Sequence, residues 1–187
     1  MDYYLELTLR PDPEFAPTVL MTALYNKLHR GLVQLGTRYV GVSFPHVNEA
    51  KPALGEIMRL HGEVDELERL MATNWLNGIR DHVTMSQLAP VRKECSYRVV
   101  RRVQAKSNPE RLRRRRAMRK GISLEQAREL IPDTAATHLK LPFVRIRSQS
   151  TGHTFPLFIE HMPLIATKSA GEFGCYGLSA VAAVPWF

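Results

Sequence analysis

The first ninety residues change their hydrophobic period several times, and this pattern restricts the fold more than any other feature of the chain. Apolar and polar residues alternate over 3–9 (YYLELTL), as in a strand with one buried face. Leucines then recur at three- and four-residue intervals from Leu20 to Leu35, which is the spacing of an amphipathic helix ending at Gly36. The sequence therefore predicts a strand followed by a long helix that covers one face of a sheet.

The same region contains signals for three more strands and a second helix. We expect strands over 38–44, 56–62 and 81–88, and a helix over 64–76. The order β-α-β-β-α-β is that of a ferredoxin-like domain, which is also the topology of RNA-recognition domains. We assign residues 1–94 to this domain.

A second domain of the α+β class is expected over residues 95–187, so the whole chain is predicted to be α+β. Ser123 and Gln126 form a capping box that starts a short helix ending near Leu130. Alternating patterns predict the strands of another sheet over 95–105, 142–148, 153–161 and 172–179.

One segment carries the basic character of the chain, whose net charge is +8 and whose pI is about 9.8. Residues 98–120 hold 11 of the 26 lysines and arginines and one of the 18 acids. A helix is expected over 108–120, with Asn108 as its cap, Pro109 at its first position and Gly121 at its end. Such concentration of charge indicates a local binding element.

The arginines of this helix favour a polyanionic partner. Arg111, Arg115 and Arg119 follow one another at four-residue spacing along one face, and like charges at this spacing repel each other. A solvated basic surface is the ordinary alternative, but few acids and a thin apolar stripe favour nucleic acid. The charge does not distinguish DNA, whose major groove admits a helix, from an RNA hairpin, whose groove widens at a helix end.

Other classes of protein are disfavoured by composition. Cys95 and Cys175 are far apart and no CxxC motif exists, so neither a zinc site nor a redox motif is expected. No carboxylate cluster is evident, and we expect neither a metal nor another cofactor. The N-terminal stretch lacks the apolar core of a signal peptide, and no apolar run approaches the roughly 18 residues of a membrane span. We expect a cytoplasmic protein with no membrane partner.

Several stretches together resemble a known family. The resemblance extends over the whole chain and is carried by SFP (43–45), RRVQAKSNPERLRRR (101–115), IPDT (131–134), LPFVRIRSQSTG (141–152), CYGLS (175–179) and VPWF (184–187). These stretches are similar to those of the type I-F CRISPR repeat-processing endoribonucleases. The resemblance implies a metal-independent, monomeric ribonuclease that binds the stem-loop of the CRISPR repeat transcript. It also implies 2′-hydroxyl attack at the 3′ base of the hairpin, and retention of the guide RNA together with other protein subunits of the interference complex.

The resemblance also assigns four catalytic residues. His29 in KLHR matches the catalytic histidine, and Ser148 in RIRSQS matches the serine that holds the attacking ribose hydroxyl. Tyr176 in CYGL matches a tyrosine near that histidine, and Ser150 would contact the phosphate. A histidine suits proton transfer near neutral pH, and a serine can position the ribose by a hydrogen bond.

The expected RNA-binding residues lie mostly around the basic segment. Arg102 and Gln104 would read base edges, and their spacing places both on one side of a strand. Phe155 would stack on the terminal base pair, although alternation alone would make it a core residue. The groove-binding arginines would be Arg111, Arg114, Arg115 and Arg119. Where family members can carry two adjacent arginines late in this helix, the chain has Met118 before Arg119.

Two other functions remain open at this point. Without the resemblance, His29 beside the apolar stripe is an ordinary structural histidine, and a non-catalytic RNA-binding subunit needs only the arginine helix. A basic DNA-binding module is the third possibility. The remaining histidines share no ligand spacing and are interpreted as structural or surface residues: His46, His61, His82, His138, His153 and His161.

Overall fold

A computed structural model describes residues 1–48, 50–104, 109–132, 139–148 and 152–187. Its contacts group the chain into two compact units, one of residues Met1–Val103 with Leu141–Phe187 and the other of Gln104–Lys140. This division differs from the boundary expected near residue 94. The strands of the second half share a hydrophobic core with the first half, and only Gln104–Lys140, which hold the arginine helix and the helix after it, form a separate unit.

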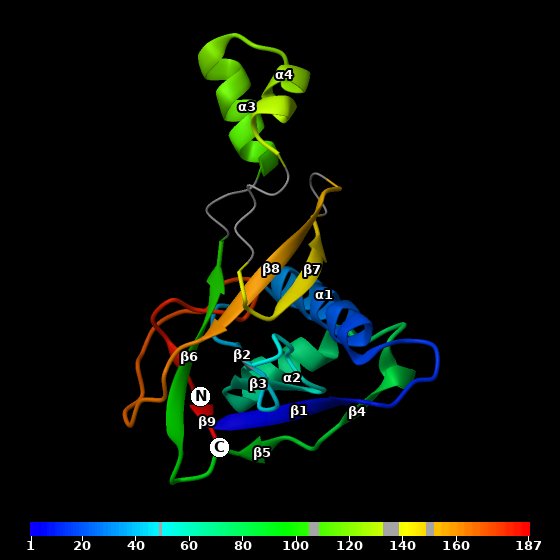
Figure 1. The fold of residues 1–187 in the computed structure, drawn as a ribbon. Coiled ribbons are helices and arrows are strands. Elements are labelled where there is room, and N and C mark those ends of the chain that lie inside the picture. Colours follow the sequence, from blue (N-terminus) through cyan, green and yellow to red (C-terminus); the bar gives the residue numbers. More distant parts are fainter. Residues whose placement is uncertain (49, 105–108, 133–138, 149–151) are drawn as a thin grey trace. The chain divides into compact units, whose positions relative to one another are not determined.

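The first sheet of the larger unit confirms the ferredoxin-like order (Figure 1). Its strands run β2-β3-β1-β4, with every neighbouring pair antiparallel, and β5 pairs with the start of β1. The strands are β1 (Tyr3–Leu9), β2 (Gly41–Ser43), β3 (Ile57–Gly62), β4 (Val83–Met85) and β5 (Ala89–Pro90). The helical elements are α1 (Pro17–Leu35), α2 (Val64–Ala72) and the single turn η1 (Arg80–His82).

Three of these elements are shorter than their hydrophobic patterns predict. Helix α2 ends at Ala72, because the following segment turns through Asn74 and Gly78, both of which have positive φ. The expected strand over 81–88 begins only at Val83, since the residues before it form η1. Likewise, only Gly41–Ser43 of the expected strand over 38–44 form β2.

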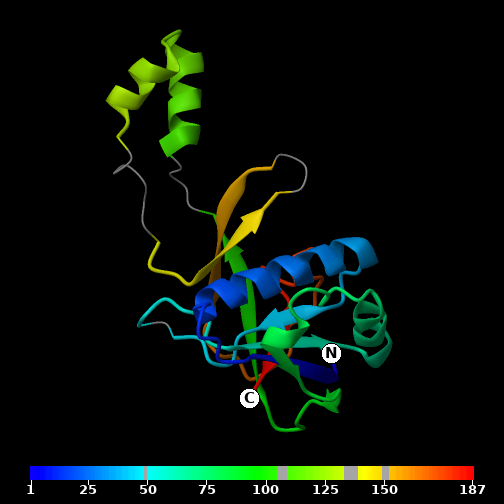
Figure 2. The same ribbon diagram turned by 90° about the vertical axis from the view of Figure 1, so that its right-hand side faces the viewer.

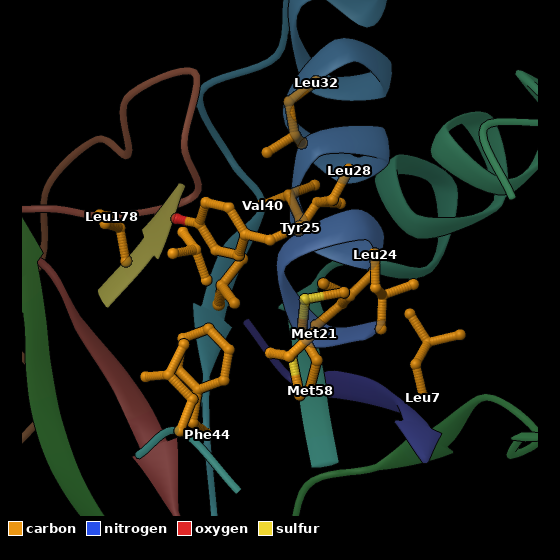
Figure 3. Close-up of a cluster of buried hydrophobic side chains, with 14 of the residues drawn as sticks. Leu7, Met21, Leu24, Tyr25, Leu28, Leu32, Val40, Phe44, Met58 and Leu178 are labelled. Carbon is orange, nitrogen blue, oxygen red and sulfur yellow. The ribbon is translucent and has the colours of Figure 1, made fainter. Parts of the chain in front are cut away.

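Helix α1 ends at Gly36 as the sequence predicts, and it begins at Pro17, three residues before the first leucine of the predicted stripe. Pro17 occupies its first turn, and Gly36 ends it in the left-handed region with its N–H donated to the Leu32 carbonyl. Its apolar stripe is buried against the first sheet, where Leu24 and Leu28 are fully buried and Leu24 lies near Leu7 of β1 (Figure 3). The packing of this stripe fixes which helical residues face the rest of the unit.

The second sheet has the order β7-β8-β6-β9, again antiparallel. Its strands are β6 (Ser96–Val103), β7 (Phe143–Arg147), β8 (Thr154–His161) and β9 (Ala183–Trp186). Alternate residues of β7 are buried, and Val144 and Ile146 join the common core. Strand β7 packs on α1, and the two lie side by side in Figures 1 and 2.

The strand predicted over 172–179 is wrong. This segment forms a turn in which Gly177 donates its N–H to the Gly174 carbonyl and has φ of 67°. A left-handed residue interrupts the extended backbone, so the alternating side chains do not form a strand. The last strand, β9, lies further along the chain, at Ala183–Trp186.

The smaller unit contains α3 (Pro109–Lys120) and α4 (Leu124–Leu130). Helix α3 confirms the expected arginine helix, although its proposed cap Asn108 lies outside the described residues. The capping box of α4 is confirmed, with Ser123 and Gln126 each accepting the other's backbone N–H. Arg113 is the one buried residue of α3, and it donates from Nε to the Ile131 carbonyl at 2.9 Å, which ties α3 to the end of α4.

Candidate active site

His29 lies on α1 beside the buried stripe and is itself only half-buried. Its Nδ1 is 2.9 Å from the carbonyl oxygen of Cys175. A carbonyl oxygen can only accept a hydrogen bond, so Nδ1 must carry the proton. The neutral ring therefore has its lone pair on Nε2, and this is the atom through which His29 can take up a proton.

Tyr176 lies flat against His29, with ring centroids 4.3 Å apart and planes 16° from parallel. The Tyr25 hydroxyl donates to the Tyr176 carbonyl at 2.7 Å. Tyr25 and His29 are one helical turn apart on α1, and they bind the carbonyl groups of consecutive residues, Tyr176 and Cys175. Helix α1 thus holds the segment that orients His29 in two ways. His29 stacks on the ring of Tyr176, and hydrogen bonds from Tyr25 and His29 hold the backbone of residues 175 and 176.

Burial raises the pKa of both tyrosines near the histidine. For Tyr176 the desolvation of its half-buried ring is the largest cause, and the nearby Arg102 guanidinium acts in the opposite direction. Tyr25 is fully buried, and its pKa is raised well above its usual value, chiefly by desolvation. Both hydroxyls therefore remain protonated at neutral pH and can donate hydrogen bonds.

The segment carrying Tyr176 is fixed against the first sheet by Gly177. The carbonyl of Gly177 accepts the Val42 N–H of β2 at 2.9 Å. A Cβ at Gly177 would lie 2.3 Å from Val42 Cγ2, and its φ of 67° also disfavours other residues. Glycine is required here because the turn approaches β2 so closely.

Arg102 of the second sheet also lies beside Tyr176. Its guanidinium carbon is 5.4 Å from the centroid of the Tyr176 ring and 5.6 Å from that of Phe155. Arg102 belongs to β6 and Phe155 to β8. The rings of Tyr176 and Phe155 thus flank the Arg102 guanidinium. The structure therefore gathers four of the predicted site residues, His29, Tyr176, Arg102 and Phe155, within one unit.

Ser148 directly follows β7, the strand that pairs with β8. Its N–H is donated to the His153 carbonyl and its carbonyl accepts the Gly152 N–H, both at 2.9 Å. It lines a surface hollow of about 320 Å³ together with Arg30, Arg147 and Gly152. Ser150, the fourth predicted catalytic residue, lies outside the described residues.

Asn26 connects the helix of His29 to the strand that precedes Ser148. Its Nδ2 donates to the Arg145 carbonyl at 2.7 Å, and its Oδ1 accepts the Arg147 N–H at 3.3 Å. These two bonds, together with the packing of β7 on α1, help to set the position of the helix along the strand and so the separation of His29 and Ser148.

The remaining predicted RNA-binding residues belong to the smaller unit. Gln104 and four arginines of α3 are exposed there: Arg111, Arg114, Arg115 and Arg119. In the parts of the chain that the structure describes, no acid pairs with Arg114, Arg115 or Arg119. These side chains can therefore offer their charge to an anion.

Over the described ranges, no three His, Cys, Asp or Glu side chains are grouped so that they could hold a metal ion. Among the helices that these ranges contain, none has the length and apolar character needed to cross a membrane.

These features define a class: α+β proteins with a ferredoxin-like domain and a separate basic helical unit. Within that class, the chain belongs to the family of CRISPR-associated proteins described as Cas_Csy4, whose family model matches residues 4–187. It is 54% identical to the CRISPR-associated endonuclease Cas6/Csy4 of Pseudomonas aeruginosa (strain UCBPP-PA14). It is 44% identical to the protein of the same name from Escherichia coli (strain UTI89 / UPEC), and each alignment covers all of both chains. The resemblance inferred from the sequence is confirmed at the level of the family.

Proposed function

We propose that the protein is the endoribonuclease that processes CRISPR precursor RNA in a type I-F system. Its substrate is the repeat stem-loop, which it cuts once at the 3′ base and then retains as a guide-RNA subunit among other protein subunits. The proposal is supported by full-length similarity to two proteins named CRISPR-associated endonucleases. It is supported also by the basic α3 helix, which suits the phosphates of an RNA stem.

The observation that carries the catalytic part is the hydrogen bond from His29 to the Cys175 carbonyl. It leaves Nε2 as the proton acceptor, in a unit where Asn26 ties the same helix to the strand before Ser148. In the proposed reaction Nε2 removes the proton of a ribose 2′-hydroxyl, which Ser148 positions by a hydrogen bond.

The chemistry needs no nucleophile from the protein. The 2′-oxygen forms a bond to the adjacent phosphorus while the bond from phosphorus to the 5′-oxygen breaks. The products are a 2′,3′-cyclic phosphate and a 5′-hydroxyl, which receives a proton. The reaction as proposed is independent of a metal ion, because the histidine supplies the base and the substrate supplies the nucleophile. Ser150 would contact the phosphate.

Recognition is assigned to both units. Arg102 and Gln104 would read base edges near the foot of the stem, and Phe155 would stack on its last base pair. The arginines of α3 would bind the groove and its phosphates. We propose that the free protein is a cytoplasmic monomer.

The test is cleavage of a 5′-labelled repeat hairpin in excess EDTA. A second RNA carries deoxyribose at the nucleotide 5′ of the scissile phosphate, which removes the nucleophile. We expect cutting of the first RNA alone. His29→Ala should abolish cutting and leave affinity for the hairpin nearly unchanged, whereas His46→Ala, in the loop after β2, should cut normally.

The alternative is a non-catalytic RNA-binding subunit. It predicts tight binding of the hairpin with no cutting by the wild-type protein. A His29→Ala protein that cuts at the wild-type rate would instead leave the nuclease intact and remove His29 from its mechanism.

A further inference from the structure

The smaller unit contains very few buried side chains. Among its described residues, only Arg113 of α3 and Ala127 of α4 are buried, whereas Met118, Leu124 and Leu130 are exposed. An apolar core therefore contributes little to holding α3 and α4 together. Polar contacts must stabilise the arrangement of the two helices.

Helix α3 has little stability of its own. It spans Pro109–Lys120, and isolated helices of this length are marginal in water. Three of its arginines, Arg111, Arg115 and Arg119, repel one another at four-residue spacing. The helix that the proposed function assigns to RNA therefore depends on contacts with the rest of its unit.

Arg113 makes the contacts that join the two helices. Its side chain is only 10% exposed, and its Nε donates to the carbonyl of Ile131 at 2.9 Å. Ile131 is the C-cap of α4, and the carbonyl groups at a helix C-terminus lack helical partners and attract cations. Nη1 of Arg113 donates to a carboxylate oxygen of Glu110, in the first turn of α3, at 3.4 Å. The guanidinium is thus held by groups of both helices through charge-assisted hydrogen bonds.

The direction of Arg113 determines which way the other arginines point. Successive residues of an α-helix are about 100° apart, so Arg115 lies about 200° around the helix axis from Arg113. Arg111 and Arg119 lie on the same side of the helix as Arg115. Because Arg113 is turned toward α4, the stripe formed by these three arginines is turned away from α4, and all three are exposed.

We propose that Arg113 is a positioning residue for RNA binding. It holds α3 in helical form and fixes its rotation, so that the stripe of Arg111, Arg115 and Arg119 is presented to the RNA stem. Arg113 itself does not contact the RNA, because its side chain is buried against α4. The inference rests on the proposed function and deepens it. Because α3 is already ordered in the free protein, RNA binding does not bear the entropic cost of ordering this helix.

Hydrogen exchange of the free protein tests the positioning role without RNA. Arg113→Met keeps a long side chain of good helix propensity and removes the donors. We expect the amides of α3 to exchange roughly tenfold faster in this variant, because hydrogen bonds of a charged group are lost. The amides of α1 should exchange as in wild type, which shows that the larger unit is intact. Arg115→Met replaces an exposed arginine of α3 in the same way and should leave the exchange of this helix unchanged.

Binding of the repeat hairpin at several salt concentrations tests whether Arg113 contacts the RNA. For Arg113→Met we expect the affinity to fall roughly tenfold, since the RNA must now order the helix. The slope of log affinity against log salt should stay that of wild type, because no phosphate contact is lost. Arg115→Met should instead lower the slope by about 0.9, the value for one phosphate of a duplex. Arg113→Lys retains a cation that can donate to the Ile131 carbonyl, and it should recover part of the lost affinity.

Two outcomes would overturn the positioning role: exchange of α3 in Arg113→Met equal to that of wild type, or a salt slope in Arg113→Met reduced as in Arg115→Met. Failure of the proposed function is seen separately, as a wild-type protein that neither binds nor cuts the hairpin, and it leaves the exchange result unaffected.

Discussion

The hydrogen bond from His29 to Cys175 fixes which nitrogen of the ring is open to accept a proton. With Nδ1 donating to the carbonyl, Nε2 alone alternates between acceptor and donor as the ring changes its charge. Tyr176 restricts rotation of the ring by lying flat against it. A residue that must take a proton from a defined direction benefits from both restraints.

His61 of β3 is a different kind of histidine, and it predicts how stability depends on pH. It is fully buried, with Nε2 2.8 Å from the Ser43 hydroxyl, and burial together with Arg59 and the N-terminal amine lowers its pKa to about 3. The unfolded chain binds this proton near pH 6.5 and the folded chain does not. The free energy of unfolding should therefore fall as pH decreases from 6.5 toward 3, by up to about 1.4 kcal/mol per pH unit from this residue.

Urea unfolding at several pH values measures this slope. His61→Gln removes the titrating group and should flatten the decline between pH 6 and about 4, even if the variant is less stable throughout. Exposed His153 offers the matched control, and His153→Gln should keep the wild-type slope. An equal slope in His61→Gln and wild type would show that other groups cause the loss.

Only those residues of the candidate site that lie in a recognisable family motif were predicted from the sequence. The family motifs led to His29, Ser148, Tyr176, Arg102 and Phe155. The supporting residues Tyr25 and Asn26 were missed, because their partners are more than a hundred residues away and ordinary periodicity contains no such information. Their spacing of four and three residues before His29 is the one local signal, since it places them within one turn of the histidine.

Among the elements, α1 has the central position in the proposed mechanism. Its apolar stripe packs on the first sheet. Tyr25, Asn26 and His29 form hydrogen bonds to the segment 175–176 and to strand β7. The helix was predicted closely because its leucines and Gly36 mark its buried face and its end. The segment 172–179 was mispredicted, because its contacts with β2 require a left-handed turn that alternation cannot reveal.

The link between α1 and β7 gives a prediction for Asn26. Asn26→Ala removes both hydrogen bonds to β7 and should slow cleavage at saturating RNA by roughly tenfold to a hundredfold, since His29 and Ser148 lose their alignment. Hairpin affinity should change little, because the amide is engaged with backbone groups of the protein. Single-turnover cleavage and equilibrium binding measure the two effects separately.

Asn26→Asp sharpens the test. A carboxylate can still accept the Arg147 N–H but cannot donate to the Arg145 carbonyl, so we expect an intermediate or equal loss of rate. Asn77→Ala, at an exposed asparagine of the same unit, is the control and should cleave normally. Loss of RNA affinity without loss of rate in Asn26→Ala would contradict a positioning role.

At the scale of the molecule, the proposed cleavage and much of the expected charge recognition belong to different units. His29 and Ser148 lie in the larger unit, and the arginines of α3 lie in the smaller one. Changes in α3 are therefore expected to act on binding and its salt dependence, with the cleavage rate at saturating RNA preserved.

Met118 allows this separation to be tested by adding charge. It is 88% exposed on α3, beside Arg119, so a longer cation can be placed there without disturbing the core. Met118→Arg should tighten hairpin binding and steepen its salt dependence by about one unit of slope. Met118→Ala should do neither, and an unchanged slope in Met118→Arg would indicate that this position faces away from the RNA.

The register of the second sheet shows where the smaller unit joins the larger one. Val103, the last residue before the smaller unit, and Phe143, just after it, both pair with Phe158 of β8, one from each side. The two junctions are therefore about two strand spacings apart, roughly 10 Å. An insertion with its ends so close can be exchanged for another without reshaping its host. The architecture thus offers a route by which one cutting scaffold could acquire new hairpin preferences, by replacement of a module between two neighbouring points of a sheet.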